Sequence, residues 1–323
     1  MVVQQTTKSY SSTPSTVFTI VIPIRNRMRK FLPIFIMALF SAYSGWCQDL
    51  DSLLDQQMGP QINYATATFK SSRIIDFHSV EQMKTGQLDF RINHRFGMLN
   101  TGPYEFWGLD QSTIKLSLEL GLTDWLMVGI GRSSYEKTYD GSYKVKLFRQ
   151  CSGAKNFPVT ISYFSSIHIN TLKWDNPNQT NYFSSRLAYT HQILVGRKFS
   201  ERLSLQLSPT LVHRNLVATT LDQNDLWAMG FGGRIKLTTR FSLNFEYYYI
   251  ARPINQLTDI KYTNPLSFGV DIDTGGHVFQ LFVTNSVGNS ENHIIGETTG
   301  KWSKGDIHFG FNISRVFSVY SGK

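Results

Sequence analysis

Residues 227–250 decide the fold, and they read Trp227-Ala-Met-Gly-Phe-Gly-Gly-Arg-Ile-Lys-Leu-Thr-Thr-Arg-Phe-Ser-Leu-Asn-Phe-Glu-Tyr-Tyr-Tyr-Ile250. In 227–237 and again in 241–249, mostly large apolar side chains alternate with small or polar ones. A helix would spread the charged residues around its circumference, whereas a strand places alternate side chains on opposite faces. We therefore predict two antiparallel strands joined by a tight turn at 238–240, each with one apolar and one polar face.

The same alternation recurs along the chain from residue 86 onward. Segments of about ten residues have the length that a tilted strand needs to cross the hydrocarbon layer of a membrane. We predict twelve strands, near residues 88–96, 114–121, 125–134, 142–150, 157–169, 183–197, 203–213, 226–237, 241–250, 265–273, 277–286 and 305–317.

The connections between these strands alternate in length. The short ones are residues 122–124, 151–156, 198–202, 238–240 and 274–276, and the longer, polar ones are 97–113, 135–141, 170–182, 214–225, 251–264 and 287–304. Outer-membrane barrels have short periplasmic turns and long external loops, and closure removes strand edges that lipid cannot satisfy. The pattern predicts an all-β fold, a transmembrane up-and-down antiparallel barrel of about twelve strands with both ends on the periplasmic side.

An export signal precedes the barrel. Four basic residues within 25–30 lead into the apolar run 31–40, and small and polar residues follow up to Gln48. Ten apolar residues are too few to cross a bilayer as a helix, so we predict a cleaved signal peptide. We expect cleavage between Cys47 and Gln48. The alternative is a lipoprotein site at Cys47, which the bulky Trp46 disfavours.

These features divide the chain into three parts. Residues 1–47 contain a start-site extension and the signal peptide, because translation could begin at Met1 or at Met28. Residues 48–85 alternate poorly and are predicted to be either a periplasmic extension or a plug folded into the lumen. Residues 86–320 form the predicted barrel.

The net charge of +9 does not indicate a nucleic-acid partner. Several basic residues belong to the predicted signal peptide, and no later run interleaves Lys or Arg with aromatic residues. The mean hydropathy of −0.20 suits a barrel, whose strands are apolar only at every second residue. We expect the cell outer membrane as the location, with membrane lipid and the outer-membrane assembly machinery as partners.

The polar faces of the strands predict which side chains line the lumen. Two hypotheses stay open for them: salt bridges that fill the interior, or a weakly polar conduit. A selective ion or phosphate pore should carry a ring of one sign, and both signs occur here. The predicted lumen-lining residues are Asp89, Arg91, Arg95, Lys115, Glu119, Lys144, Lys146, Arg186, Arg234, Lys236, Glu246, Asp271, Asp306 and His308.

No catalytic, metal or cofactor site is predicted. Ser166, His168 and an acid such as Asp306 could supply a hydrolase triad, but the sequence has no G-x-S-x-G motif. It also has no H-E-x-x-H, C-x-x-C or Asp-rich calcium loop. After cleavage Cys151 would be the single cysteine, which excludes an internal disulfide. His191 falls on the lipid-facing side, so we expect a bulge or an interfacial position there.

Five segments carry a resemblance to a known family: residues 68–75, 88–97, 108–110, 121–125 and 129–141. Over roughly residues 60–320 the chain resembles an uncharacterised family of membrane-bound β-barrel domains from Gram-negative bacteria. The resemblance implies a barrel in the cell envelope and brings no catalytic residues. One feature departs from many such barrels, which end in an aromatic residue: Phe317 and Tyr320 are followed here by Ser321-Gly-Lys323.

The predicted function is structural or the passive passage of a small solute, without catalysis. Two alternatives are a barrel-embedded hydrolase of lipid or peptide and an adhesin-like protein that binds a surface partner through its long loops. The loops best placed for the second alternative are 97–113 and 287–304.

Overall fold

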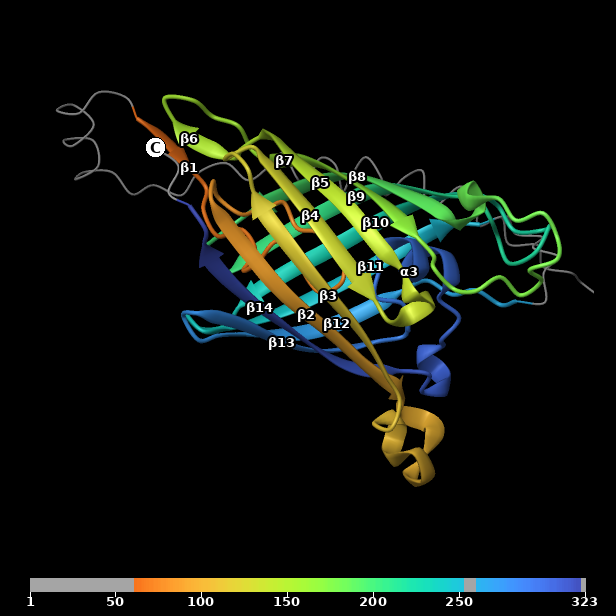
Figure 1. The fold of residues 1–323 in the computed structure, drawn as a ribbon. Helices are drawn as coiled ribbons and strands as arrows, with labels where there is room; N and C mark the ends of the chain where they lie inside the picture. Colours follow the sequence, from red (N-terminus) through yellow and green to blue (C-terminus); the bar gives the residue numbers. More distant parts are fainter. Residues whose placement is uncertain (1–60, 253–259, 321–323) are drawn as a thin grey trace, which may run out of the picture. The chain divides into compact units, whose positions relative to one another are not determined.

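The computed structural model describes residues 61–252 and 260–320. Twelve of its strands form one closed barrel, in which each strand pairs antiparallel with the next barrel strand along the chain, and β14 pairs with β2 (Figure 1). The predicted up-and-down barrel is thus confirmed, whereas the predicted signal peptide lies outside the described residues. The barrel strands are β2 (Gln87–Met98), β3 (Ser112–Gly121), β4 (Leu126–Ser133), β5 (Tyr139–Phe148), β7 (Thr160–Ile169), β8 (Leu187–Lys198), β9 (Leu203–Arg214), β10 (Asp225–Lys236), β11 (Phe241–Ala251), β12 (Leu266–Asp273), β13 (His277–Thr284) and β14 (His308–Ser318).

The smaller elements lie outside the barrel strands. Two short strands, β1 (Ile62–Tyr64) and β6 (Cys151–Gly153), pair with each other apart from the barrel sheet. One α-helix is present in the part of the chain that the structure describes, α3 (Glu291–Glu297), between β13 and β14. Among the described residues no helix has the length and apolar character needed to cross a membrane. The 3₁₀ segments are η2 (Leu99–Thr101), η3 (Pro103–Gly108), η4 (Tyr135–Lys137), η5 (Phe183–Arg186) and η6 (Trp302–Lys304).

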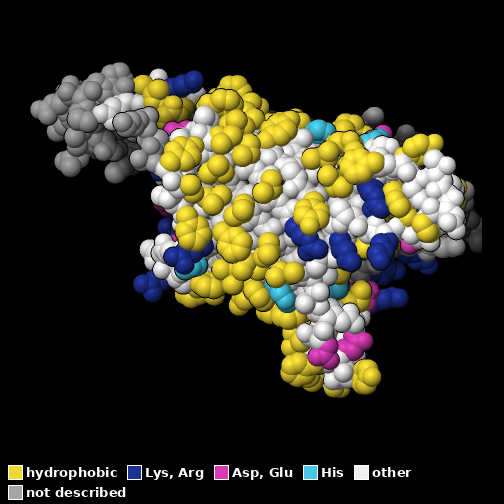
Figure 2. Space-filling view, viewed as in Figure 1, with side chains coloured by type: hydrophobic (Ala, Val, Ile, Leu, Met, Phe, Trp, Pro, Cys, Tyr) yellow, Lys and Arg dark blue, Asp and Glu magenta, His cyan; other side chains and the backbone are white. Residues whose placement is uncertain are grey.

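The outer face of the wall is apolar, because the alternating side chains point away from the lumen at every second position. Leu118 of β3 and Ile130 of β4 sit opposite each other in this face, and both are exposed. Figure 2 shows apolar side chains gathered over the strands on the visible side of the barrel. A surface of this kind is stable against lipid hydrocarbon, which is what a transmembrane barrel requires.

His191 on this outer face is accommodated without a bulge. The pairing of β7 with β8 is regular at this position, where His191 lies opposite Ser165. Its Nδ1 atom lies 2.8 Å from the hydroxyl of Tyr163 and 3.1 Å from that of Ser165. The bulge that the sequence suggested is therefore absent, and neighbouring hydroxyls satisfy the imidazole instead.

The connections define two ends of the barrel. The short-turn end holds residues 122–125, 199–202, 237–240 and 274–276, together with the longer connection 149–159. The long-loop end holds 99–111, 134–138, 170–186, 215–224 and 285–307, together with the described residues 252 and 260–265. The expectation that short and long connections alternate without exception is wrong at one place, because 149–159 contains β6 and exceeds 134–138 at the opposite end.

The lumen is filled by the inner segment, which we define as residues 68–83. Nearly all of its residues are buried, and they contact inward side chains of strands all around the barrel. Small residues on the wall make room for it: a Cβ added at Gly232 would lie 2.4 Å from the Cδ1 atom of Ile74. The chain then turns into β2 at Gly86, whose φ of +76° favours glycine.

Two apolar clusters anchor the inner segment inside the polar lumen. Phe77 packs with inward residues of β9, β10 and β11 and with two isoleucines of α3. Its ring stacks on that of Tyr248, with centroids 3.8 Å apart. Ile75 and Val80 belong to a second cluster, which also contains Phe164. The inner face of the wall is therefore a mixed polar and apolar core rather than a uniformly wet surface.

Candidate functional site

Most of the predicted lumen-lining residues are buried on the inner face of the wall. The buried ones are Asp89, Arg91, Arg95, Lys115, Glu119, Lys144, Arg234, Glu246, Asp271 and His308. Lys146 and Lys236, near the short-turn end, are only partly buried. Arg186 and Asp306 lie outside the strands, because β8 begins at Leu187 and β14 at His308.

Arg186 and Asp306 make local contacts at the long-loop end. Arg186 donates from Nη1 to the carbonyl oxygen of Asn170, 2.8 Å away, and stacks over the ring of Trp174. Asp306 accepts hydrogen bonds from Asn100, at 2.7 Å, and from the backbone N–H of Lys301, at 3.0 Å. Both side chains stabilise loops in this structure.

The inward charges bind the backbone of the inner segment. The ammonium group of Lys144 donates to the carbonyl oxygens of Ser72, Ser79 and Glu81, at 3.0, 3.0 and 2.8 Å. The carboxylate of Glu246 accepts the backbone N–H of Asp76, at 2.8 Å. Buried backbone groups need such partners, and the inner segment has no regular secondary structure to supply them. The lumenal charges therefore supply the hydrogen-bond partners that a neighbouring strand would supply in a sheet.

A buried ion network ties the inner segment to the wall and to α3. Arg73 lies 3.4 Å from the carboxylate of Glu119 and 2.8 Å from that of Glu291. Glu119 also accepts a hydrogen bond from the hydroxyl of Ser72, at 2.6 Å. On the wall, Lys115 pairs with Asp140 at 2.8 Å. A charge removed from water needs compensation of this kind.

The short distances between charged groups in the network explain the pKa shifts of Glu291 and His78. Burial alone would raise the pKa of Glu291, but the positive charges of Arg73 and Lys115 outweigh it and lower that pKa to about 2. Burial lowers the pKa of His78, and the neighbouring charges of Arg73 and Lys144 lower it further. The network therefore holds an ionised carboxylate beside a neutral imidazole at neutral pH.

A cavity of about 580 Å³ opens at the long-loop end. Its walls come from η4, from α3, from the connections 170–186, 215–224 and 260–265, and from the adjoining ends of β7, β8 and β9. Both signs of charge line it, including Arg214, Lys173 and Glu297. This volume lies in the range of sites that hold small molecules. The inner segment contributes no residue to the lining, and it packs against two residues of α3, Ile294 and Ile295, that do not line the cavity either.

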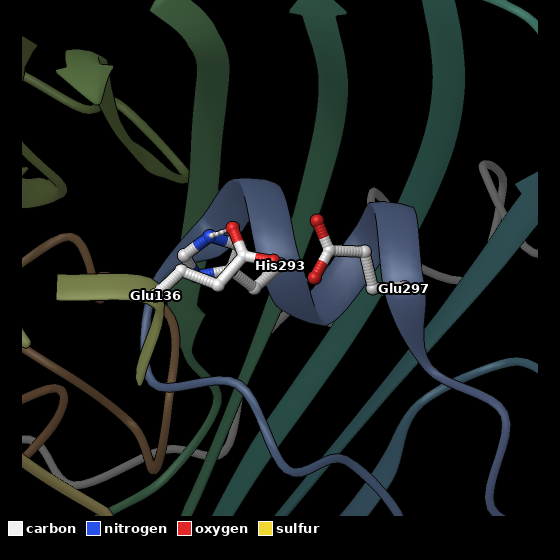
Figure 3. A group of neighbouring side chains, drawn as sticks. All are labelled: Glu136, His293 and Glu297. Carbon is white, nitrogen blue, oxygen red and sulfur yellow. Dashed lines mark ion pairs between the residues drawn. The ribbon is translucent and has the colours of Figure 1, made fainter. Parts of the chain in front are cut away.

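Three ligand-type side chains meet at the wall of this cavity: Glu136, His293 and Glu297 (Figure 3). The Nε2 atom of His293 lies 3.3 Å from a carboxylate oxygen of Glu136, and a ligand atom from each residue lies within 4.8 Å of the other two. Asn170 donates to Glu136 at 2.7 Å, and the hydroxyl of Tyr135 donates to Glu297 at 3.3 Å. We call these three residues the EHE cluster.

The two carboxyl groups of the EHE cluster have different environments. The hydrogen bond from His293 lowers the pKa of Glu136, an effect that outweighs burial. Burial raises the pKa of Glu297. Such a divergence between neighbouring acids is common at functional sites.

The EHE cluster was missed because no contiguous motif contains it. Glu136 follows β4, whereas His293 and Glu297 belong to α3, more than 150 positions further along the chain. One local signal was available: His293 and Glu297 are four residues apart, which places them on one face of a helix. The sequence pattern predicted a loop and no helix in 287–304, so the four-residue spacing had no structural meaning there.

The residues from which a hydrolase triad could have been drawn do not form one. The Nε2 atom of His168 lies 2.9 Å from the hydroxyl of Ser166, and the nearest carboxylate oxygen, from Glu291, lies 4.0 Å from that same nitrogen. The other ring nitrogen of His168 has no hydrogen-bond partner among the described residues. Asp306 is held in a loop by Asn100. A triad needs the base to contact its nucleophile and its acid through different nitrogens.

The observations define the class of the protein. A closed ring of antiparallel strands with an apolar exterior and a polar, filled interior is a transmembrane β-barrel. The chain belongs to the family described as membrane bound beta barrel domain (DUF5777), whose model matches residues 69–317. The match includes almost the whole inner segment, and it confirms the resemblance seen in the sequence.

Three solved structures are similar to the chain in outline. An outer membrane channel from Pseudomonas putida F1 is 12% identical with a TM-score of 0.47, covering 75% of this chain and all of the channel. The NanC porin is 9% identical with a TM-score of 0.45, covering 72% of this chain and all of the porin. Outer membrane phospholipase A from Escherichia coli is 11% identical with a TM-score of 0.39, covering 72% and 91%. No curated protein matches the chain in sequence.

Proposed function

We propose that the protein is an outer-membrane barrel that is closed at rest by the inner segment and that passes a small polar solute when part of this segment moves. The solute enters the cavity at the long-loop end, which faces outward in outer-membrane barrels. The observation that carries the proposal is the position of the inner segment between that cavity and the short-turn end, inside the ring of strands.

Energetics limit how the barrel opens. The apolar side chains that the inner segment buries are Phe69, Ile74, Ile75, Phe77, Val80 and Met83. At about 2 kcal/mol each, exposing all of them would cost on the order of 10 kcal/mol. Complete expulsion would then be very rare. Local displacement, which breaks only some hydrogen bonds and exposes one or two apolar side chains, is the physically accessible route.

The predicted lumen-lining charges have a role in this proposal. Side chains such as Lys144 and Glu246 hold the resting segment, and they also provide polar partners for water and solute once it moves. Recognition by the assembly machinery remains a prediction. The roles of residues 1–47 and 48–60, which lie outside the described residues, remain predictions as well.

The test is a disulfide that locks the inner segment to the wall. A Cβ added at Gly196 of β8 would lie 3.4 Å from the Cβ of Val80, close to the separation of about 3.5–4.5 Å found in disulfides. The pair Val80→Cys and Gly196→Cys is introduced together with Cys151→Ser, which removes the buried free thiol. Single Val80→Cys in the same background is the control.

Single-channel current is then recorded in planar bilayers before and after reduction. We expect brief, small openings in the reduced protein and in the control, and silence in the oxidised double variant. Phe77→Ala should make openings more frequent, because it removes the largest apolar anchor. Equal currents in the locked and reduced forms, or no current in any form including Phe77→Ala, would refute passage by movement of this segment.

A further inference from the structure

The EHE cluster brings two carboxyl groups together, and the chain balances their charge only in part, because Arg214 acts on Glu297 from the cavity wall without forming a close ion pair with it. Among the described residues, neither Glu136 nor Glu297 pairs with a lysine or arginine, and the ion-pair partner of Glu136 is the imidazole of His293. Two carboxylates within 4.8 Å of one another repel when both are ionised. A cation between them would relieve this repulsion, so the two facing carboxylates favour a positively charged ligand.

The geometry narrows the kind of cation. His293 and Glu297 project from the same face of α3, and Glu136 approaches them from η4 (Figure 3). The gap of 3.3 Å between His293 and Glu136 matches the spacing of about 3.4 Å between two ligands of a tetrahedral ion with bonds near 2.0–2.2 Å. The ligand atom of Glu297 lies within 4.8 Å of the other two and has to approach by up to about 1.4 Å to reach the same spacing.

We propose that Glu136, His293 and Glu297 bind one divalent transition-metal ion of the zinc class, with a fourth coordination position open to the cavity. Imidazole with two carboxylates suits zinc and its neighbours, whereas calcium takes six to eight oxygen ligands. Because all three residues line the cavity, a water or a solute can reach the remaining position. The proposal does not depend on passage through the barrel.

The residues around the EHE cluster hold its three side chains in fixed positions. His293 is 2% exposed, so its position is fixed by packing, and its ring meets that of Tyr135 edge-on, with centroids 4.9 Å apart. Asn170 and Tyr135 each donate a hydrogen bond to one of the two carboxylates. Partners that orient the ligands in this way are typical of metal sites and contribute to affinity.

The experiment measures metal binding to the whole chain, expressed from residue 1 without a polyhistidine tag, purified in detergent and stripped with a chelator. Zn²⁺ is titrated by calorimetry, and Co²⁺ is added as a probe because its visible absorption distinguishes tetrahedral from octahedral coordination. We expect one Zn²⁺ per chain and a tetrahedral Co²⁺ spectrum. Ca²⁺ should compete weakly.

Three variants and a matched control decide the assignment. Glu136→Gln and Glu297→Gln should each weaken Zn²⁺ binding by at least about tenfold. His293→Gln should abolish the tetrahedral spectrum. His213→Gln is the control, because His213 also pairs with a carboxylate, Asp225, at 2.7 Å but is exposed and belongs to no three-residue cluster among the described residues.

Heat-modifiable migration in gels shows which variants retain the barrel. Glu136 lies in a connection and is partly exposed, so Glu136→Gln should fold even if substitution of the buried His293 does not. The proposal is overturned if the wild-type chain binds no Zn²⁺ or shows only octahedral Co²⁺. It is equally overturned if Glu136→Gln binds as tightly as wild type, or if His213→Gln loses the ion.

Discussion

The two faces of the barrel wall come from one alternating sequence, yet they have very different surroundings. In β3, Leu118 points outward and is 38% exposed, whereas its neighbour Glu119 points inward and is 2% exposed. Leu118 needs only an apolar environment. Glu119 has specific partners in Ser72 and Arg73, from a distant part of the chain. The outer face is therefore defined by composition, and the inner face by individual contacts.

The largest effect should come from breaking an inner contact. Arg73→Gln removes the charge that faces both Glu119 and Glu291 and leaves two buried carboxylates poorly compensated. Loss of one partner of a buried ion pair costs about 3–5 kcal/mol. We expect a loss of this size in the free energy of unfolding, measured by urea titration of the protein in lipid vesicles.

Arg315→Gln is the matched outer-face control for this experiment. Arg315 is exposed near the end of β14 and stacks on Phe317. Its removal should cost less than about 1 kcal/mol. If the two arginine variants lose equal stability, the contrast between the two faces does not hold.

A somewhat smaller effect should follow from placing a charge on the outer face. Ile130→Arg near the middle of β4 replaces an exposed aliphatic side chain that would lie against lipid. A basic residue at the middle of the membrane costs about 2–4 kcal/mol in a barrel. Ile130→Leu, measured in the same vesicles, should be close to neutral. An equal tolerance of arginine and leucine would mean that this face does not contact hydrocarbon.

The outer face and the strand order were predictable because both depend on local pattern. Period-two alternation gave all twelve strands, since lipid imposes the same apolar requirement on each of them. Errors arose at the ends, where turn chemistry and loop packing decide: β8 and β14 begin later than predicted, so Arg186 and Asp306 lie in loops. The alternation of side chains along each strand predicted that charged residues such as Lys144 and Glu246 point inward, but it did not predict which residues they contact.

The inner segment and the EHE cluster depend on contacts between distant residues, which one sequence does not reveal. Residues 68–83 have no alternation and adopt no regular element, so local pattern could not separate a plug from an extension. Small inward residues such as Gly196 and Gly232 were a usable signal, because a wall that packs against another chain segment needs room. His293 joins Glu136 only when α3 folds toward η4 at the long-loop end.

The smallest predicted effect concerns pH and a single inner residue, His78. Burial lowers its pKa below the usual 6.5, and the charges of Arg73 and Lys144 add to this, while the carboxylates of Glu119 and Glu291 lie 3.9 and 3.8 Å from its Nε2 atom. The unfolded chain therefore takes up a proton near pH 6.5 that the folded chain excludes, and stability falls as the pH drops below that value.

Urea unfolding at about pH 7.5 and about pH 5 should show this loss in the wild type, and a smaller loss in His78→Gln. Glu291 contributes little to this difference, because above about pH 5 its carboxyl group is ionised in both the unfolded chain, with its ordinary pKa of 4.5, and the folded chain, with its lowered pKa. An identical pH dependence in the two proteins would mean that His78 is already protonated in the folded barrel and pairs with those carboxylates.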